Sequence, residues 1–331
     1  MTDETILITG GAGYIGSHTA LLLKQAGYRV LVLDNLAYGH AEFVKDVVGA
    51  ELIVGDICDR ALLNTIFSTH TVAGVIHFAA HTYVRESVIK PALYYNNNVA
   101  GTLTLLNAMV EANVKRIVFS STCAIYGTPQ QMPMAEDHPQ APMSPYGMTK
   151  LMGEKILADF DQAYGLRSVC FRYFNAAGAD PEARLGEDRT PETHLIPLMM
   201  MTALGHRDKI YIYGTDYDTP DGTCIRDYIH VLDLAQAHRL GLEYLLNNGL
   251  TDTFNLGTGH GFSVREVIEV GKQVTQRSFP VIETKRRAGD PPILVADTTK
   301  VNKILGWKAQ RTQLETMLED SWRWHQQRHG R

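Results

Sequence analysis

A tyrosine and a lysine four positions apart, Tyr146 and Lys150, are the side chains of this sequence that best suit proton transfer. Ser144 can cap a helix and Pro145 suits its first turn, so Tyr146 and Lys150 would stand one turn apart on one helix face. A phenol has an ordinary pKa of about 10 and becomes a usable base when a neighbouring ammonium favours its phenolate. We therefore predict that Tyr146 removes a hydroxyl proton and that Lys150 lowers the pKa of Tyr146.

A third hydroxyl follows the apolar run Arg116–Ser121, which predicts a strand. The carboxyl ends of strands in an open α/β sheet face the ligand cleft, and Thr122 stands directly after this one. Its hydroxyl could hydrogen-bond the oxygen that Tyr146 deprotonates. Taken singly, Thr122 is better explained as a cap of the next element, and Tyr146 and Lys150 as a surface pair at helical spacing. The combination of the three favours catalysis.

Three glycines, Gly10, Gly13 and Gly16, stand between a predicted strand, Thr5–Thr9, and a predicted helix, Ser17–Ala26. This arrangement aims the N–H groups at the start of the helix at a pyrophosphate. A tight structural turn is the alternative interpretation of the glycines by themselves. The spacing is GxxGxxG and differs from the GxGxxG of many dehydrogenases.

An acidic residue, Asp34, ends the next predicted strand, roughly 20 residues beyond the glycines. A carboxylate at this position accepts hydrogen bonds from the adenosine ribose and would repel a 2′-phosphate. The sequence therefore predicts a site for NAD and not NADP, with Asn35 sharing the ribose contact. With NAD as cofactor, Lys150 would also hydrogen-bond the nicotinamide ribose.

The alternation of short apolar runs with longer amphipathic runs predicts an α/β fold. It is typical of βαβ units, which build a doubly wound parallel sheet of the Rossmann type. Further predicted elements are Arg29–Asp34, Glu51–Val54, Gly74–Phe78, Val99–Glu111 and Arg116–Ser121. Beyond residue 175 the chain is richer in turn residues, which predicts a second, smaller mixed α/β domain. We expect a Rossmann domain over 1–175, to which a segment near 226–240 returns, and a second domain over 176–331.

Charge and cysteine content exclude several classes of partner. The net charge is −5 at pH 7, so nothing in it supports binding to nucleic acid or an anionic membrane. The four cysteines form no CxxC pair, which favours buried thiols in a reducing compartment and a cytoplasmic protein. The acidic N-terminus and the lack of a long apolar run argue against a signal peptide and a transmembrane helix. His325 and His329 have a helical spacing, but Trp322–Arg331 is polar, so we expect a solvated helix end and no metal.

Longer strings over nearly the whole chain resemble the extended short-chain dehydrogenase/reductases and, within them, the UDP-glucose 4-epimerase family. The strings are GGAGYIGSHT at 10–19, GDI at 55–57, YYNNNVAGTL at 94–103, SSTCAIYG at 120–127, SPYGMTK at 144–150, RYFNAAGA at 172–179, HLIP at 194–197, DYDTPDGTCIRDYIHVLDLAQAH at 216–238 and RRAGD at 286–290. The later strings are more diagnostic than the glycine loop.

The resemblance implies a set of NAD-binding residues. They are Gly10, Gly13, Tyr14, Ile15, Gly16, Asp34, Asn35, Asp56, Ile57, Phe78, Ala79, Ala80, Asn98, Ser120, Tyr146, Lys150 and Tyr173. By the same resemblance, Asp56 and Ile57 flank the adenine, Asn98 reaches the cofactor phosphates, and Ser120 lies beside the nicotinamide.

The resemblance also implies a UDP-sugar site, with the diphosphate near Asn175. Its residues are Thr122, Tyr146, Asn175, His194, Leu195, Tyr213, Arg226, Arg287, Asp290 and Leu294. Leu195 and Tyr213 are expected around the uracil, Asp290 on the ribose, and the two arginines on the phosphates. Two guanidiniums suit the roughly two negative charges of UDP. From the residues alone, an ion pair of Arg226 with Asp227 or Asp233, and a solvated Arg287 beside Arg286, are the favoured interpretations.

Four positions depart from the family pattern. Thr82 stands where a lysine is common, and Ala176 replaces a proline. His194 replaces an asparagine, although its backbone could still serve. Leu294 stands where a tyrosine accompanies restriction to glucose and galactose and a smaller residue accompanies N-acetyl sugars.

The resemblance implies interconversion of UDP-glucose and UDP-galactose through a 4-keto sugar, with tightly bound NAD and a homodimer. UDP-N-acetylhexosamines stay open as substrates, and another nucleotide-sugar 4-epimerase, for example of UDP-glucuronate, is the alternative. Resembling 4,6-dehydratases carry Asp-Glu directly after the threonine as acid and base, where this chain has Cys123 and Ala124. A non-catalytic NAD or UDP-sugar sensor could share the fold, but it would not need Thr122, Tyr146 and Lys150.

Overall fold

The chain folds into two compact units. The computed structural model describes residues 5–287 and 289–330, so residues 1–4, Ala288 of the RRAGD string and Arg331 lie outside the described residues. Unit 1 is composed of Met1–Gly127, Pro139–Arg172 and Ala235–Phe254, and unit 2 of Thr128–His138, Tyr173–Leu234 and Asn255–Arg331.

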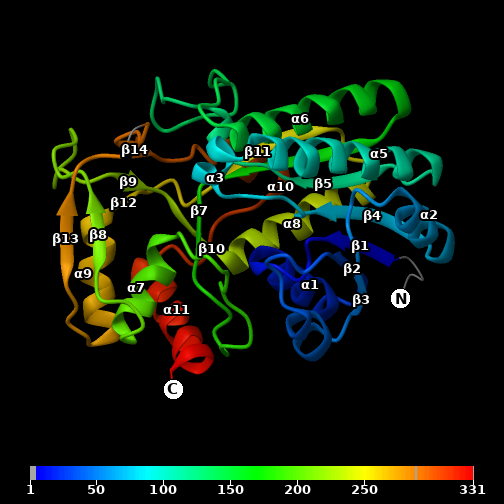
Figure 1. The fold of residues 1–331 in the computed structure, drawn as a ribbon. Helices are drawn as coiled ribbons and strands as arrows, with labels where there is room; N and C mark the ends of the chain where they lie inside the picture. The colour runs from blue at the N-terminus through cyan, green and yellow to red at the C-terminus, as the bar shows by residue number, and fades with distance from the viewer. Residues whose placement is uncertain (1–4, 288, 331) are drawn as a thin grey trace. The chain divides into compact units, whose positions relative to one another are not determined.

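A seven-stranded sheet forms the centre of unit 1, in the order β11-β6-β5-β4-β1-β2-β3 (Figure 1). Its strands are β1 (Thr5–Thr9), β2 (Arg29–Asp34), β3 (Glu51–Val54), β4 (Val72–His77), β5 (Arg116–Ser120), β6 (Arg167–Tyr173) and β11 (Asp252–Leu256). The pairings from β3 through to β6 are parallel. The order reverses between β1 and β4, which is the point where doubly wound sheets bind their ligands. The predicted Rossmann-type fold is therefore confirmed.

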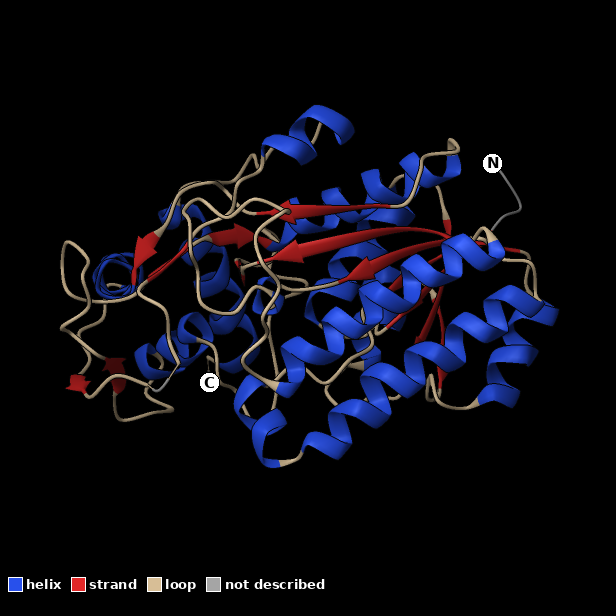
Figure 2. Ribbon diagram, turned by 90° about the horizontal axis from the view of Figure 1, so that it is seen from above, coloured by secondary structure: helices blue, strands red, loops and turns tan. Residues whose placement is uncertain are grey.

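Helices lie along both faces of this sheet, and in Figure 2 long helices cross in front of the strands. They are α1 (Tyr14–Gln25), η1 (Phe43–Val48), α2 (Arg60–Thr69), α3 (Val84–Ile89), α4 (Pro91–Tyr94), η2 (Tyr95–Gly101), α5 (Thr102–Glu111), η3 (Cys123–Ile125), α6 (Pro145–Tyr164) and α8 (Val231–Leu246). One buried cluster, which includes Leu105, Phe119 and Leu157, joins the sheet to α2, α5 and α6. On the other face, Gly241 of α8 lies against Phe171.

The predicted elements of the first half match the structure closely. The predicted strands Arg29–Asp34 and Glu51–Val54 have the observed bounds of β2 and β3. Helix α1 begins at Tyr14, three residues before the predicted start, because the glycine loop runs directly into it. The predicted Ser144 cap of α6 is confirmed, since its hydroxyl accepts a hydrogen bond from the N–H of Gly147 at 3.2 Å.

Unit 2 combines short strands with helices, as the mixed α/β expectation required. Its elements are β7 (Asn175–Ala177), α7 (Leu195–Ala203), β8 (Ile210–Tyr213), β9 (Ile225–Arg226), β10 (Tyr228–His230), β12 (Phe262–Ser263), α9 (Val264–Thr275), β13 (Val281–Thr284), β14 (Ile293–Leu294), α10 (Thr299–Leu305) and α11 (Leu314–His329). Its core is built from α7, α9 and α11, with Met199, Ile268 and Leu318 fully buried.

Two expectations about surface chemistry were wrong. The chain's end is not a solvated helix, because Trp322, Trp324 and His325 of α11 are buried, and burial lowers the pKa of His325 to about 4. Of the four cysteines only Cys170 and Cys224 are buried, and Cys58 is exposed. Across the described residues, the helices are all too short or too polar to cross a membrane.

Candidate active site

The glycine loop of unit 1 is shaped by close backbone contacts. A Cβ atom on Gly16 would lie 2.2 Å from the carbonyl oxygen of Gly10, and one on Gly10 would lie 2.5 Å from the nitrogen of Ala79. Gly13 is the N-cap of α1 and places no side chain over the first turn, where a Cβ would meet only the Gly10 oxygen at 3.4 Å. An uncapped helix start with open space above it fits the pyrophosphate of a dinucleotide.

Asp34 lies beside this loop at the end of β2. Its carboxylate accepts hydrogen bonds from the N–H groups of Ala12 at 2.9 Å and Leu36 at 2.8 Å. Burial raises the pKa of Asp34, and these two hydrogen bonds act in the opposite direction. The structure therefore brings the predicted ribose-binding carboxylate to the glycine loop.

The two residues predicted to flank the adenine, Asp56 and Ile57, have different surroundings. The side-chain amide of Asn35 donates to Asp56 at 2.9 Å. Burial acts to raise the pKa of Asp56, but hydrogen bonds from Cys58 and Asn35 lower it overall. Ile57 is only 4% exposed and belongs to the core of the sheet. The expected role of Ile57 beside a ligand therefore stays a prediction, and its observed role is packing.

Asn98, expected near the cofactor phosphates, is already engaged by the protein. Its side-chain oxygen accepts from the N–H of His81 at 2.8 Å, and its amide donates to the carbonyl of His81 at 2.9 Å and to the hydroxyl of Thr149 at 3.1 Å. Asn98 thus ties the loop after β4 to α6. The same loop begins with Phe78, Ala79 and Ala80. The N–H groups of Phe78 and Ala79 both donate to the carbonyl oxygen of Thr9.

The three predicted catalytic side chains lie on α6 and at the end of β5. Tyr146, Lys150 and Thr122 are all buried or nearly so, at 9%, 3% and 7% exposure. Lys150 Nζ donates to the carbonyl oxygen of Ser120 at 2.7 Å, which fixes α6 to the strand end that precedes Thr122. Gly147 allows the two segments to approach, because a Cβ there would lie 2.6 Å from the carbonyl oxygen of Ala124.

Burial gives Lys150 its unusual ionisation. It lowers the pKa of Lys150 to about 7, while Cys170 and Glu154 act to raise it. Lys150 also lies 4.9 Å from the centroid of the Phe119 ring, a cation–π contact. An ammonium can stabilise a neighbouring phenolate, and one with a pKa near 7 loses its proton near neutral pH at little cost in free energy.

In unit 2 the structure brings together four predicted substrate residues at and around strand β9. Arg226 pairs in register with Leu294 of β14, and its guanidinium lies 3.9 Å from the carboxylate of Asp290. The N–H of Asn175 bonds to the carbonyl of Asp227, the residue after Arg226, at 3.1 Å. Arg226 therefore pairs with neither of the acids suggested by sequence proximity.

Arg287 and Tyr213 form a second contact in unit 2. The guanidinium of Arg287 lies 3.8 Å from the centroid of the Tyr213 ring. Its neighbour Arg286 instead stacks over Tyr217 and pairs with Asp216 at 2.6 Å. A cation over an aromatic face suits a flat base and a phosphate together.

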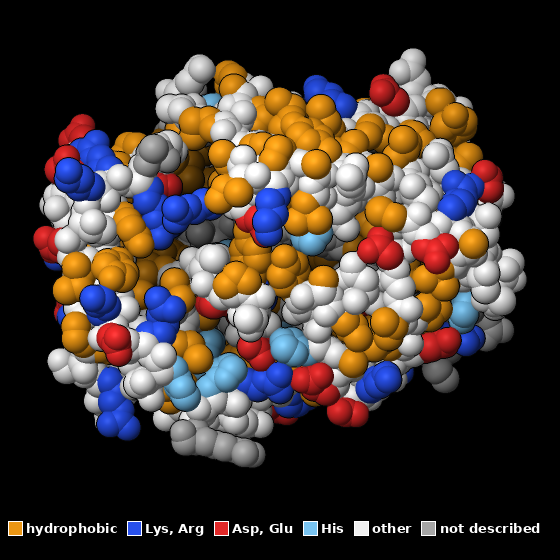
Figure 3. Space-filling view, in the orientation of Figure 1, with side chains coloured by type: hydrophobic (Ala, Val, Ile, Leu, Met, Phe, Trp, Pro, Cys, Tyr) orange, Lys and Arg blue, Asp and Glu red, His pale blue; other side chains and the backbone are white. Residues whose placement is uncertain are grey.

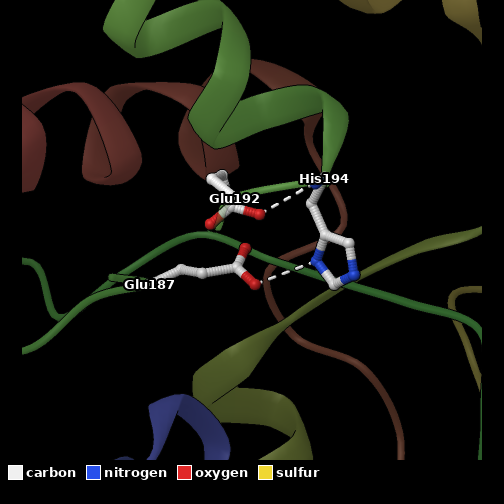
Figure 4. A group of neighbouring side chains, drawn as sticks. All are labelled: Glu187, Glu192 and His194. Atoms are coloured by element: carbon white, nitrogen blue, oxygen red, sulfur yellow. Dashed lines mark hydrogen bonds and ion pairs between the residues drawn. The ribbon is translucent and has the colours of Figure 1, made fainter. Parts of the chain in front are cut away.

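His194 is the N-cap of α7, directly before Leu195, and Figure 4 shows it with Glu187 and Glu192. Its side chain is 50% exposed and lies 2.9 Å from Glu187. The ligand atoms of these three residues lie within 4.8 Å of one another, a spacing that could hold a metal ion. The guanidinium of Arg189, however, lies 2.6 Å from the Glu187 carboxylate and 2.8 Å from His194 Nδ1, so a protein cation already fills the cluster.

Sequence reasoning missed the carboxylate that organises the Arg226 region. Asp227 is fully buried and accepts hydrogen bonds from the N–H groups of Thr258, Gly259 and Ala296 and from the Thr258 hydroxyl. Burial raises the pKa of Asp227, and these bonds oppose the shift. The available signal was an acidic residue between the β-branched and aromatic residues of the strand region Ile225–His230.

Known families and proteins match nearly the whole length of the chain. The model of the GDP-mannose 4,6 dehydratase family matches residues 7–321. A UDP-glucose 4-epimerase of Halalkalibacterium halodurans is 55% identical over 326 residues, which cover 98% of this chain and 97% of that protein.

Solved structures of UDP-glucose 4-epimerases are also similar to this chain. The crystal structure of UDP-glucose 4-epimerase from Brucella ovis in complex with NAD has 49% identity and a TM-score of 0.94, covering 97% of this chain and 98% of that one. The UDP-glucose 4-epimerase of Bifidobacterium longum in complex with NAD⁺ and UDP has 40% identity and a TM-score of 0.93, covering 98% and 99%.

Proposed function

This chain belongs to the UDP-glucose 4-epimerase family, and on that basis we propose that it interconverts UDP-glucose and UDP-galactose with NAD as a tightly held cofactor. The observation that carries the proposal is the Tyr146 and Lys150 pair of α6, fixed to the strand end of Ser120 and Thr122 by the 2.7 Å bond from Lys150. The glycine loop and Asp34 would hold NAD, because the space over Gly13 and the start of α1 suit its pyrophosphate.

In the proposed reaction, bound NAD supplies the two-electron acceptor and then the donor for C4 of the hexose. Tyr146 takes the proton of the 4-hydroxyl as C4 is oxidised, and returns it when the 4-keto sugar is reduced on its opposite face. Lys150 stabilises the phenolate and would bind the nicotinamide ribose. Thr122 would hydrogen-bond the same sugar oxygen.

Unit 2 would hold the nucleotide. Arg226 and Arg287 supply two positive charges for the diphosphate, Asp290 suits the uridine ribose, and Tyr213 offers a ring for the uracil. Asn175, His194 and Leu195 complete the proposed site. The hexose must stay loosely held so that it can turn, while the UDP group remains anchored.

Substitution of Tyr146 by phenylalanine tests the proposal. We expect wild-type protein to interconvert UDP-galactose and UDP-glucose, and Tyr146→Phe to lose at least about 100-fold in kcat while keeping its NAD, because general acid and base catalysis contributes on the order of 10²–10⁴-fold. Near-wild-type activity in Tyr146→Phe would overturn the assignment. A wild-type protein inactive on UDP-glucose, UDP-N-acetylgalactosamine and UDP-glucuronate would favour a non-catalytic sensor.

The family model carries the name of a dehydratase, so elimination is the second candidate function. Dehydration of a 4-keto sugar needs an acid and a base near C5 and C6. The two residues after Thr122 are Cys123 and Ala124 of η3, which do not provide the Asp-Glu acid and base pair of resembling dehydratases. We therefore expect no 4-keto-6-deoxy sugar among the products, which mass spectrometry of the reaction mixture would detect.

A second copy of the chain is the proposed protein partner. Exposed apolar side chains gather on unit 1, where Figure 3 shows hydrophobic atoms over α3, α5 and α6, and they include Val84, Val88, Ile89, Leu103 and Met152. Patches of this kind mark interfaces. Light scattering after chromatography should give a dimer mass that Val88→Asp lowers.

Because Cys58 is exposed, we place the protein in the reducing cytoplasm.

A further inference from the structure

A buried ion pair lies one helical turn beyond Lys150. Glu154 of α6 and Arg172 of β6 have side chains 8% and 5% exposed. The guanidinium binds the carboxylate side-on in a bidentate pair, with Nε donating to Oε1 at 3.0 Å and Nη2 to Oε2 at 2.6 Å. Tyr146, Lys150 and Glu154 follow one another at four-residue spacing, so they share one face of α6.

The pair also joins the strand end that carries the proposed catalytic hydroxyl. The Ser121 hydroxyl donates to Glu154 Oε1 at 2.5 Å, and Ser121 stands between Ser120 and Thr122. Arg172 Nη1 donates to the hydroxyl of Tyr126, just beyond η3, at 2.9 Å. One carboxylate thus connects α6 with the ends of β5 and β6.

Glu154 acts electrostatically on Lys150 and favours its ammonium form. Cys170 of β6 and His77 of β4 also interact with Lys150, and Tyr146 stands one helical turn before it on α6. Burial, with Lys150 as a second cause, lowers the pKa of His77 to about 3, so its ring is neutral. Burial raises the pKa of Cys170 well above its ordinary value, so its thiol is neutral too. Among these groups, Glu154 alone bears a negative charge before Tyr146 ionises.

We propose that Glu154 is a positioning residue of the epimerase reaction: its carboxylate, oriented by Arg172, keeps Lys150 in its ammonium form and holds the Ser120–Thr122 strand end against α6. The inference rests on the proposed function, because Glu154 acts through Tyr146 and Lys150. An ion pair that served folding alone would leave the ionisation of the site unchanged.

The pH dependence of kcat for UDP-galactose tests this role. Removing a negative charge lowers the pKa of every group that titrates nearby. We expect both limbs of the profile to move to lower pH in Glu154→Gln by roughly one pH unit, the shift that a unit charge about 10 Å away causes at an effective dielectric constant of about 20. In Glu154→Gln/Arg172→Gln the guanidinium that would be left unpaired is also removed, so the pH profile should return toward wild type.

Two controls separate charge from structure. Arg172→Lys keeps the positive charge but loses the bidentate pair with Glu154, so its pH profile should stay in place even if its melting temperature falls. Arg167→Gln removes an exposed cation of the same strand, which pairs with Asp161 at 3.3 Å, and should change neither property. If Glu154→Gln does not fold, Arg172→Gln gives the opposite test: it leaves the Glu154 carboxylate without its cation, so both limbs should move to higher pH, and an unmoved profile would overturn the inference.

A second measurement does not depend on turnover. The ultraviolet absorbance of tyrosinate is titrated in each protein, and the curve of the same protein carrying Tyr146→Phe is subtracted. The pKa of Tyr146 should shift with the kcat profile. Unchanged profiles and unchanged Tyr146 titration in folded, NAD-containing Glu154→Gln would overturn the inference, whereas an inactive wild-type enzyme would instead overturn the proposed function.

Discussion

The side chains assigned to the cofactor and to chemistry are held differently from those assigned to UDP. In unit 1, Lys150 and Asn98 are at most 3% exposed and are bound to backbone groups. In unit 2, Arg287 is exposed and stacked on a ring. Arg226 is 12% exposed, donates to the carbonyl oxygen of Ile225 at 2.8 Å and lies 3.9 Å from the Asp290 carboxylate, longer than a hydrogen bond. Lys150 and Asn98 are fixed by the fold, whereas Arg287 in unit 2 is open to a ligand.

This difference suits the two partners proposed for them. A cofactor that stays bound through both half-reactions benefits from a site that is complete before binding, because no ordering has to occur at each turnover. A nucleotide sugar must arrive and leave, and the exposed guanidinium of Arg287 attracts its charge without holding it too tightly. Changes in unit 1 should therefore affect folding, NAD and rate together, while changes in unit 2 should affect mainly substrate affinity.

The largest effect is expected for Gly16→Ala. The new Cβ would lie 2.2 Å from the Gly10 oxygen and 2.8 Å from the Gly11 Cα, so the backbone of the loop must move. Overpacking of this kind costs about 1–3 kcal/mol of stability. We expect a lower melting temperature, no bound NAD and no detectable activity, measured by thermal unfolding, absorbance after denaturation and the epimerase assay.

Gly13→Ala is the matched variant, because its Cβ meets only the Gly10 oxygen at 3.4 Å and its φ of −82° suits any residue. It should keep the stability of the NAD-free protein to within about 1 kcal/mol, the usual scale of N-cap changes, and still lose NAD. Full NAD content in purified Gly13→Ala would show that the space over α1 is not where the pyrophosphate binds.

A smaller and more selective effect is expected for Arg226→Met. Loss of a charge-assisted hydrogen bond to the diphosphate, about 1.5–3 kcal/mol, should raise the KM for UDP-galactose roughly 10- to 100-fold and leave kcat and NAD content close to wild type. Arg265→Gln, at an exposed pair with Glu283, is the charge control. A fall in kcat at unchanged KM would contradict the contrast between the units.

Local patterns predicted the first half of the fold well. The bounds of β2 and β3, the Ser144 cap and the glycine loop all depend on neighbours within a few residues, where periodicity and capping rules apply. Asp34 could be placed because its distance from the glycines is set by one βαβ unit.

Contacts between distant positions could not be predicted in the same way. Glu154 and Arg172 are eighteen positions apart and meet only because α6 packs beside β5 and β6. The Asp290 partner of Arg226 depends on the register of two-residue strands, for which no periodicity exists. The burial of Ile57 and His325 was likewise a tertiary outcome, since neither position differs locally from an exposed one.

The smallest effect is expected at Leu294, which pairs with Arg226 at the half-buried strand β14. Leu294→Tyr should lower kcat/KM for UDP-N-acetylgalactosamine by about tenfold relative to UDP-galactose, because a pocket distinguishes groups of this size by about 1–3 kcal/mol. Leu294→Ala should move the ratio in the opposite direction, and UDP-galactose turnover itself should change by less than about threefold. A ratio that stays constant in both variants would place the N-acetyl pocket away from β14, and an altered NAD content in either would show that unit 2 also controls the cofactor.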